Sequence, residues 1–207
     1  MLVGIPLVFR SQGVIHSSYD PIVYTPTETS FQYSYRLLLE HEGNWVHHPD
    51  DKGGETYRGI ARKFNPNWYG WRFIDKIKNK QRYQNIEDAN FWVQDYYLDI
   101  WVKEGWRGIK DKEMAAYLFD FRINSYYGIR EIKKVINTFI PGTPINNQFT
   151  VETTVLINTI DSHEFCESIR KHRVRYYNNI VYNHPKQAIF LKHWLQRTKI
   201  KRTKTSL

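Results

Sequence analysis

Hydrophobic residues recur at helical spacing through most of this chain of 207 residues. Apolar side chains three and four positions apart lie on one face of a helix, so this period predicts amphipathic helices that pack on one another. The expected helices are 31–42, a segment from 85 through at least 100, 112–127, 129–140, 151–160, 162–183 and one that begins at Pro185. The pattern therefore predicts a mainly α fold.

Residues that favour helix ends mark several of these boundaries. Asn85, Thr150 and Ser162 are predicted N-caps, because their side chains can accept hydrogen bonds from the free backbone N–H groups of the first turn. Gly128 is expected to end the helix that begins at Lys112.

The segment 45–64 interrupts the helical pattern. Pro49, Gly53, Gly54 and Gly59 separate short extended pieces within it. Glycine and proline at this density favour turns, so the segment has room for one or two small β-hairpins and no more.

Both ends of the chain lack the helical period. Residues 1–30 are expected to form an extended arm and residues 199–207 a basic tail. The segment 1–9 is apolar, but no basic residue precedes it and Pro6 interrupts it, so we do not interpret it as a signal peptide. No segment is long enough and apolar enough to be predicted as a transmembrane helix.

Composition excludes two classes of protein. The chain is 41% hydrophobic and 25% charged, which is ordinary for a globular domain and unlike a disordered tail or a membrane bundle. Its single cysteine, Cys166, cannot form an intramolecular disulfide.

The positive charge is concentrated near the C-terminus. The net charge is +9, and residues 161–207 hold 11 Lys and Arg against 3 Asp and Glu. Such a distribution indicates contact with an anionic partner, which could be a nucleic acid, a phosphate-bearing wall polymer or an acidic lipid. The alternative is a basic helix that is simply solvated.

Reactive side chains are densest between Glu40 and Ile60. Glu42, at the end of an apolar helix, is placed where partial desolvation would raise its pKa and keep it protonated as a general acid. Asp51, in a glycine-rich loop, would stay ionised. Two carboxyl groups in contrasting environments suit the cleavage of a glycosidic bond, and the distance between them decides whether the configuration is retained or inverted.

Simpler interpretations remain open for each of these residues. Glu42 could be a solvated residue at a helix end, and Asp51 could only initiate a turn. Glu55 is a rival for the second carboxylate role. The histidines His47 and His48 do not match a zinc-binding spacing, so neither a metal nor an organic cofactor is expected.

The order Glu-Gly-x-x-x-x-x-Pro-x-Asp-x-Gly-Gly-x-Thr-x-x-Gly-Ile, from Glu42 to Ile60, resembles the signature of glycoside hydrolase family 108. Residues 119–125 followed by Gly128 are similar to the mid-chain helix of that family, and 173–197 are similar to its C-terminal peptidoglycan-binding region. Asn44 and Ala61 depart from the usual glycine and threonine of the family.

The resemblance implies a lysozyme-like fold with a small β-hairpin region after the first core helix. Members of the family are N-acetylmuramidases, found among phage endolysins and bacterial secretion activator proteins, that hydrolyse the β-1,4 bond from N-acetylmuramic acid to N-acetylglucosamine. The resemblance implies that Glu42 is the catalytic glutamate. Asp51 and Thr56 match the Glu, Asp, Thr order of phage lysozymes.

Substrate-binding candidates surround this segment and include one residue of the mid-chain helix. Trp45 could stack on a sugar ring or pack in the core, and Asn124 could line the sugar site or tie its helix to the catalytic loop. The full set is Trp45, Gly54, Glu55, Tyr57 and Asn124.

We expect four regions along the chain: the arm 1–30, a catalytic region 31–128, a helical peptidoglycan-binding region 129–198 packed on it, and the tail 199–207. The expected protein is a monomer that is made in the cytoplasm, is delivered to the cell wall or periplasm by another route, binds peptidoglycan and does not bind nucleic acid. The alternatives are a lytic transglycosylase and an inactive basic module that binds wall or nucleic acid.

Overall fold

The computed structural model describes residues 28–41, 45–46, 54–78 and 84–199. Eight α-helices, two short 3-10 helices and three short strands make up this part of the chain. The helices are α1 Ser30–His41, α2 Trp71–Lys78, α3 Gln84–Glu104, α4 Lys112–Asn124, α5 Gly128–Phe139, α6 Val151–Ile157, α7 Ser162–Asn183 and α8 Ala188–Gln196. The strands are β1 Trp45–Val46, β2 Thr56–Tyr57 and β3 Ile60–Ala61, and the 3-10 helices are η1 Trp106–Gly108 and η2 Pro185–Gln187.

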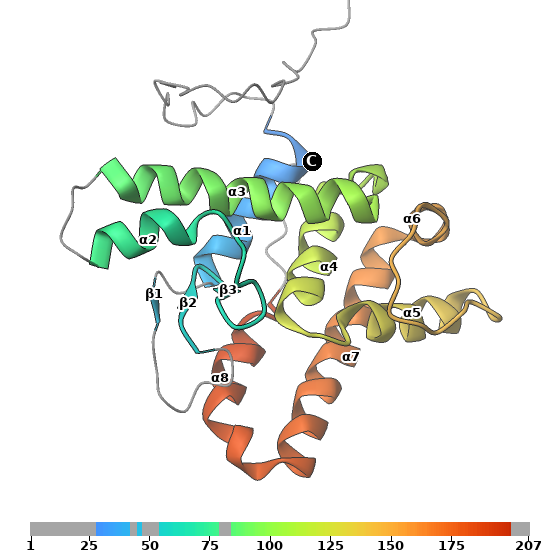
Figure 1. Cartoon of the computed structure of the whole chain (residues 1–207). Helices are drawn as coiled ribbons and strands as arrows, with labels where there is room; N and C mark the ends of the chain where they lie inside the picture. The colour runs from blue at the N-terminus through green and yellow to red at the C-terminus, as the bar shows by residue number, and fades with distance from the viewer. Residues whose placement is uncertain (1–27, 42–44, 47–53, 79–83, 200–207) are drawn as a thin grey trace, which may run out of the picture.

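Helix packing builds the core. Helix α1 packs along α4, α2 packs on α3, and α5 and α7 pack together (Figure 1). Large aromatic side chains fill the space between them, including Trp106, whose ring stacks on Phe149 with 3.7 Å between ring centroids. Burial of such side chains from water is the main source of stability in a fold of this kind. The mainly α, lysozyme-like fold predicted from the sequence is confirmed.

The three strands form the small β region expected between residues 45 and 64. They pair antiparallel in the order β1-β2-β3. Arg58 and Gly59 join β2 to β3 with positive φ angles of 45° and 82°, which is the geometry of a type I′ hairpin turn. The Tyr97 hydroxyl donates to the Arg58 carbonyl oxygen at 2.8 Å, so α3 holds the turn in place.

Two of the predicted N-caps are corrected by the structure and one is confirmed. Thr150 caps α6 in a reciprocal capping box with Thr153. Helix α7 is capped by Asp161, whose side chain accepts from the Glu164 N–H at 2.9 Å, and Ser162 is the first helical residue. Helix α3 begins at Gln84, so Asn85 lies inside it.

Gly128 begins α5, whereas the sequence pattern predicted that it ends the preceding helix. Helix α4 ends at Asn124, three residues before the predicted end, and Ser125 turns the chain. A Cβ on Gly128 would lie 2.4 Å from the Phe121 carbonyl oxygen. The glycine is therefore required by the close approach of α5 to the end of α4, and this requirement is tertiary rather than local.

Two further features were not anticipated. The short helix α2 was not predicted, because its eight residues follow a tryptophan- and glycine-containing turn without a clear cap. The helical spacing of Phe91, Trp92, Tyr96 and Ile100 marks one apolar face of α3 in the sequence. The most buried side chains of this helix are instead Ala89, Val93, Tyr97 and Trp101, and Phe91 is 48% exposed. Among the described residues, no helix is both long and apolar enough to cross a membrane.

Candidate active site

The two carboxyl groups central to the sequence hypothesis, Glu42 and Asp51, lie outside the described residues, and their roles stay predictions. The structure describes the residues on either side of them in the chain. Helix α1 ends at His41, β1 begins at Trp45, and the described chain resumes at Gly54 before β2. The segment that carries the predicted chemistry therefore connects the end of a core helix to a small sheet.

Trp45 is the most exposed of the candidate binding residues on the sheet. Its side chain is 50% exposed, and its indole Nε1 donates a hydrogen bond to Glu55 Oε1 at 3.0 Å. The two residues belong to different parts of the hairpin, since Trp45 pairs with Tyr57 across β1 and β2. An indole held by its N–H with half of its surface open to water can offer a flat apolar face to a sugar ring.

Glu55 is held from its other side by an arginine. Its Oε2 lies 2.6 Å from Arg62 Nε, and the Glu55 side chain is only 9% exposed. Arg62 also donates to Asp75 Oδ2 at 3.2 Å. The Arg62 guanidinium lies over the Trp71 ring, 4.2 Å from its centroid. Asp75, Arg62, Glu55 and Trp45 thus form a continuous chain of polar contacts that ends at the exposed indole.

The two carboxylates beside Arg62 favour its charged form. Burial acts to lower the pKa of Arg62, but the carboxylates of Asp75 and Glu55 outweigh it and hold this pKa above its ordinary value. Because a guanidinium that is always charged lies beside it, the Glu55 carboxylate is stabilised as an anion. Such a group is better suited to orient a neighbour than to donate a proton.

Thr56 and Gly54 lie next to each other at the start of β2. The Thr56 hydroxyl donates to the Gly54 carbonyl oxygen at 3.4 Å, and the Thr56 side chain is half-buried. Gly54 has a φ of +65°, where a side chain would be strained, and among the described residues no atom beyond its chain neighbours lies within 4 Å of the position of an added Cβ.

Tyr57 points into the protein. It is 6% exposed, and its hydroxyl donates to Asn90 Oδ1 of α3 at 2.9 Å. This placement favours a role in fixing the sheet on α3 over direct contact with a substrate. Tyr57 thereby keeps its register partner Trp45 at a fixed position relative to the helical core.

Asn124 is joined to α7. Its Oδ1 accepts a hydrogen bond from the Tyr177 hydroxyl at 2.7 Å, and that hydroxyl in turn accepts from Arg173 Nε at 2.9 Å. The sequence had suggested a link to the catalytic loop or a place in the sugar site. The contact seen for Asn124 is instead a link between α4 and the C-terminal helices.

A buried ionic cluster beside Asn124 was missed by the sequence analysis. Asp120 of α4 accepts from Arg173 of α7 and from Arg197, which follows α8. Burial acts to raise the pKa of Asp120, but the two guanidinium groups outweigh it and hold this pKa below its usual value. The signal in the sequence was an aspartate flanked by two phenylalanines, Phe119 and Phe121, inside a helix that is otherwise largely buried.

The other tryptophans near the candidate site belong to the core. Trp71 is 3% exposed and donates through its indole N–H to the Asn65 carbonyl oxygen at 2.7 Å. Trp68 packs edge-on against Trp71 and donates to the Trp92 carbonyl oxygen at 3.2 Å. Of these three tryptophans, Trp45 is the one with a largely open ring.

Comparison with known proteins agrees with the resemblance seen in the sequence. The family model of glycosyl hydrolase 108 matches residues 35–125, from within α1 to the end of α4. Among solved structures, SagA of Brucella abortus has a similar fold, with a TM-score of 0.55 and 15% sequence identity over 86% of this chain and 98% of that one. No curated protein matches the chain. Residues 35–125 of this chain are thus similar to the glycosyl hydrolase 108 family.

Proposed function

We propose that this protein is a peptidoglycan hydrolase that cleaves the β-1,4 bond between N-acetylmuramic acid and N-acetylglucosamine. The family match over residues 35–125 supports a glycoside hydrolase. The observation that carries the proposal is the position of the family signature, which connects the end of α1 to the small sheet. On this sheet, Glu55 holds the exposed indole of Trp45 through a hydrogen bond.

Glu42 is the proposed general acid. It follows the last residue of α1, a helix whose Leu38 is fully buried against the core. In the reaction, its carboxylic acid donates a proton to the glycosidic oxygen as the bond to the anomeric carbon breaks, and positive charge develops on the ring. Asp51 is the proposed second carboxylate, which orients water or stabilises that charge, and Thr56 assists it.

The contacts of Glu55 support this assignment of the second carboxylate to Asp51. A nucleophile or general base must reach the anomeric carbon or the attacking water, and both Glu55 oxygens already have partners in Trp45 and Arg62. Glu55 therefore acts on the substrate through Trp45, whose ring stacks on a sugar next to the bond that is cleaved.

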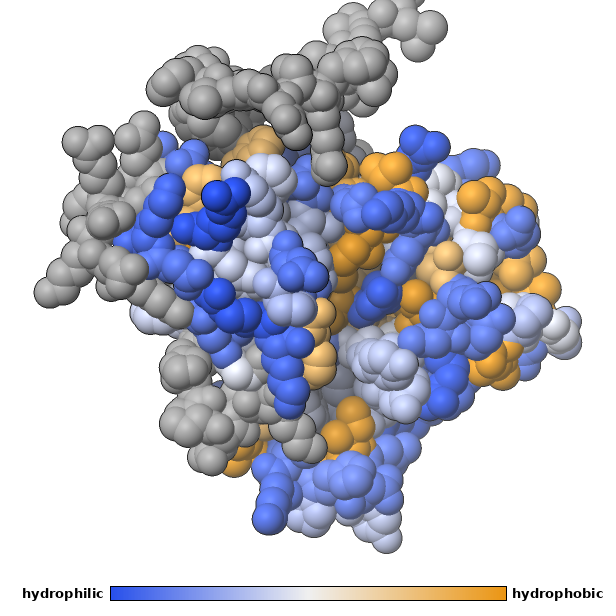
Figure 2. Space-filling model, in the orientation of Figure 1, coloured by the Kyte–Doolittle hydropathy of each residue, from blue (hydrophilic) through white to orange (hydrophobic). Residues whose placement is uncertain are grey.

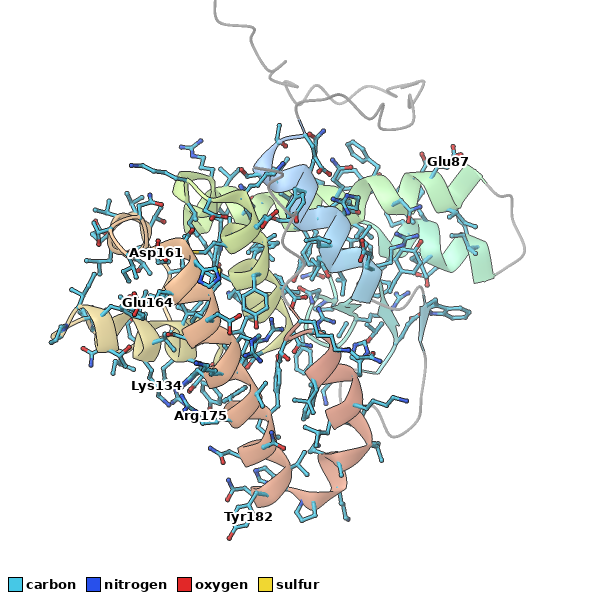
Figure 3. All side chains as sticks on the ribbon, turned by 180° about the vertical axis from the view of Figure 1, so that it is seen from behind. Glu87, Lys134, Asp161, Glu164, Arg175 and Tyr182 are labelled. Atoms are coloured by element: carbon cyan, nitrogen blue, oxygen red, sulfur yellow. The ribbon has the colours of Figure 1, made fainter. Side chains whose placement is uncertain are left out.

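The test is the hydrolysis of purified peptidoglycan by Glu42→Gln, which keeps the shape of the side chain and cannot donate the proton. We expect clearing to fall by at least about a hundredfold while the thermal unfolding curve is unchanged. Glu87→Gln is the matched control, because Glu87 is an exposed glutamate of α3 far along the chain from the signature (Figure 3). Full activity of Glu42→Gln would refute the proposal.

Mass analysis of the fragments separates the two enzymatic possibilities. Hydrolysis leaves N-acetylmuramic acid with a free reducing end, whereas lytic transglycosylation closes a 1,6-anhydro ring. We expect reducing ends. Anhydro ends would assign the protein to the second class and leave Glu42 as its acid.

A further inference from the structure

The free end of the α7–α8 hairpin exposes a cluster of apolar side chains. Tyr182 at the end of α7 is 85% exposed, and Ile189 and Phe190 at the start of α8 are 78% and 47% exposed. The 3-10 turn Pro185–Gln187 joins the two helices, so these side chains come from one tip. Figure 3 shows Tyr182 projecting from the free end of α7, beyond the rest of the described chain.

Single exposed apolar residues are normal on protein surfaces and need no explanation. This tip differs because three large ones lie within nine positions of the chain and because the helices behind them are firmly packed. Trp194 stacks on Tyr177 at 5.4 Å and on Phe190 at 5.8 Å, measured between ring centroids. The exposed residues are therefore presented by a preorganised support.

The charged residues that the hairpin itself carries beyond Glu167 are all basic. From Ser168 to the C-terminus the sequence contains no Asp or Glu. Arg175, Lys186 and Lys192 are exposed, and none of them forms an ion pair with another described residue. Hydrophilic and hydrophobic residues lie next to each other on the hairpin at the bottom of Figure 2. A surface of this kind attracts anions over several ångströms and then offers apolar contact.

We propose that the tip of the α7–α8 hairpin docks on an anionic phospholipid membrane. Ile189, Phe190 and Tyr182 enter the boundary between headgroups and acyl chains, and Lys186 and Lys192 contact lipid phosphates. This activity is separate from the proposed hydrolysis. It would hold the enzyme at the membrane face of the peptidoglycan layer.

The shape of the surface favours a bilayer over an anionic polymer. A glycan or nucleic acid chain is bound in a groove or on flat rings that stack on its units. Here the apolar groups are on a convex end of the molecule. Of the two on α8, Ile189 is more exposed than Phe190, and an isoleucine has no ring to stack and no group that donates or accepts a hydrogen bond. Burial of such a side chain is favourable in a hydrocarbon environment.

The experiment measures co-sedimentation of the full chain with vesicles of phosphatidylglycerol and phosphatidylcholine in equal parts, and with vesicles of phosphatidylcholine alone. We expect binding to the anionic vesicles only. Ile189→Ser with Phe190→Ser should weaken this binding about tenfold, since two partly buried apolar side chains are lost. Lys186→Gln with Lys192→Gln should weaken it about fivefold for each lysine.

Two double variants elsewhere on the surface serve as matched controls. Val151→Ser with Val155→Ser removes apolar residues of α6 that are 66% and 57% exposed. Arg107→Gln with Lys110→Gln removes two exposed cations near η1. Both should bind anionic vesicles as the natural chain does, and all four double variants should keep the thermal unfolding curve of the natural chain.

Insertion itself is read from an environment-sensitive dye attached to I189C, with V155C labelled as the control. Cys166 is 1% exposed, so the label is directed to the introduced cysteine. The dye on I189C should shift to shorter wavelength with anionic vesicles, and the dye on V155C should not. Two results would overturn the proposal directly: tip variants that bind vesicles like the natural chain, or a dye on I189C that does not respond to anionic vesicles. A third is that the tip variants keep their binding to vesicles and lose binding to lipid-free peptidoglycan or DNA, which would assign the tip to a polymer.

Discussion

Asp120 of α4 and Arg173 of α7 form a buried ion pair, in which the Arg173 side chain is 0% exposed and the Asp120 side chain 10%. Arg197, beyond α8, contacts the other oxygen of the same carboxylate at 2.6 Å. The Arg173 guanidinium also lies against the ring of Phe121, 4.6 Å from its centroid. One carboxylate within the family match thus holds two cations from the chain beyond it.

We predict that Asp120→Asn destabilises the protein by about 3–5 kcal/mol, because it leaves two buried guanidinium groups without a counter-charge. Urea unfolding followed by circular dichroism measures the change in the free energy of unfolding. Asp99→Asn is the control, since Asp99 pairs with Lys103 on the exposed surface of α3 and its loss should cost less than about 1 kcal/mol. Equal effects of the two substitutions would contradict the prediction.

The stability of the protein should depend on pH through Glu131. Its carboxylate is almost fully buried; burial acts to raise its pKa, but hydrogen bonds from His172 and Lys134 outweigh this and lower the pKa from 4.5 to about 2. A group whose pKa is lowered by folding stabilises the folded state above its unfolded pKa. That contribution is complete above pH 4.5 and is lost as the pH falls toward 2.

Glu131→Gln tests this dependence. The substitution should cost on the order of 2 kcal/mol at neutral pH, allowing for the water around the half-exposed Lys134. Unfolding curves of both proteins across the acid range should converge as the pH approaches 2. A difference that stays constant between neutral pH and pH 2 would show that the carboxylate charge is not responsible.

The sequence was sufficient for the elements that depend on local pattern and not for those that depend on partners far along the chain. Helical spacing located α1 and α3 to α8, and Thr150 was correctly identified as a cap. Gly128 was misassigned because the atom that excludes a side chain there, the Phe121 oxygen, belongs to a neighbouring helix. Asp120 was missed because its partners are 53 and 77 residues away.

For the candidate site, residue type alone could not separate the roles of neighbouring side chains. Trp45 and Tyr57 are both aromatic and pair across two strands, yet one is half exposed and the other is buried. Glu55 and Asp51 were rivals because both are acids in a glycine-rich segment. The partner that distinguishes Glu55, Arg62, comes from the residue after β3 and becomes its neighbour only when the sheet forms.

Gly128→Ala should destabilise the fold by about 1–3 kcal/mol, which is the usual cost of forcing an extra methyl group into a packed site. The added Cβ would overlap the Phe121 carbonyl oxygen and would lie 2.9 Å from the Arg122 Cα, so α5 would have to move away from α4. In a helix without such a neighbour the same change stabilises by up to about 1 kcal/mol. Thermal unfolding therefore tests the sign of the effect, and a more stable variant would contradict the packing argument.

The role of Glu55 can be tested by measuring whether its substitution changes KM or kcat. In Glu55→Gln the side chain keeps its size but loses the charge that Arg62 holds, so the Trp45 indole loses its fixed orientation. We expect KM for peptidoglycan fragments to rise about fivefold to tenfold, equivalent to ~1 kcal/mol, while kcat stays within about twofold.

Trp45→Ala should raise KM by at least as much, since it removes the stacking surface itself. The double variant Trp45→Ala with Glu55→Gln should have a KM little higher than that of Trp45→Ala alone, because both changes act through the Trp45 side chain. If Glu55 were instead the second catalytic carboxylate, Glu55→Gln would lower kcat by about a hundredfold or more and leave KM nearly unchanged. The two hypotheses therefore predict opposite kinetic changes from one substitution. Trp45→Phe, which retains a stacking ring and lacks the N–H that Glu55 accepts, should give a KM between those of Trp45→Ala and the natural chain.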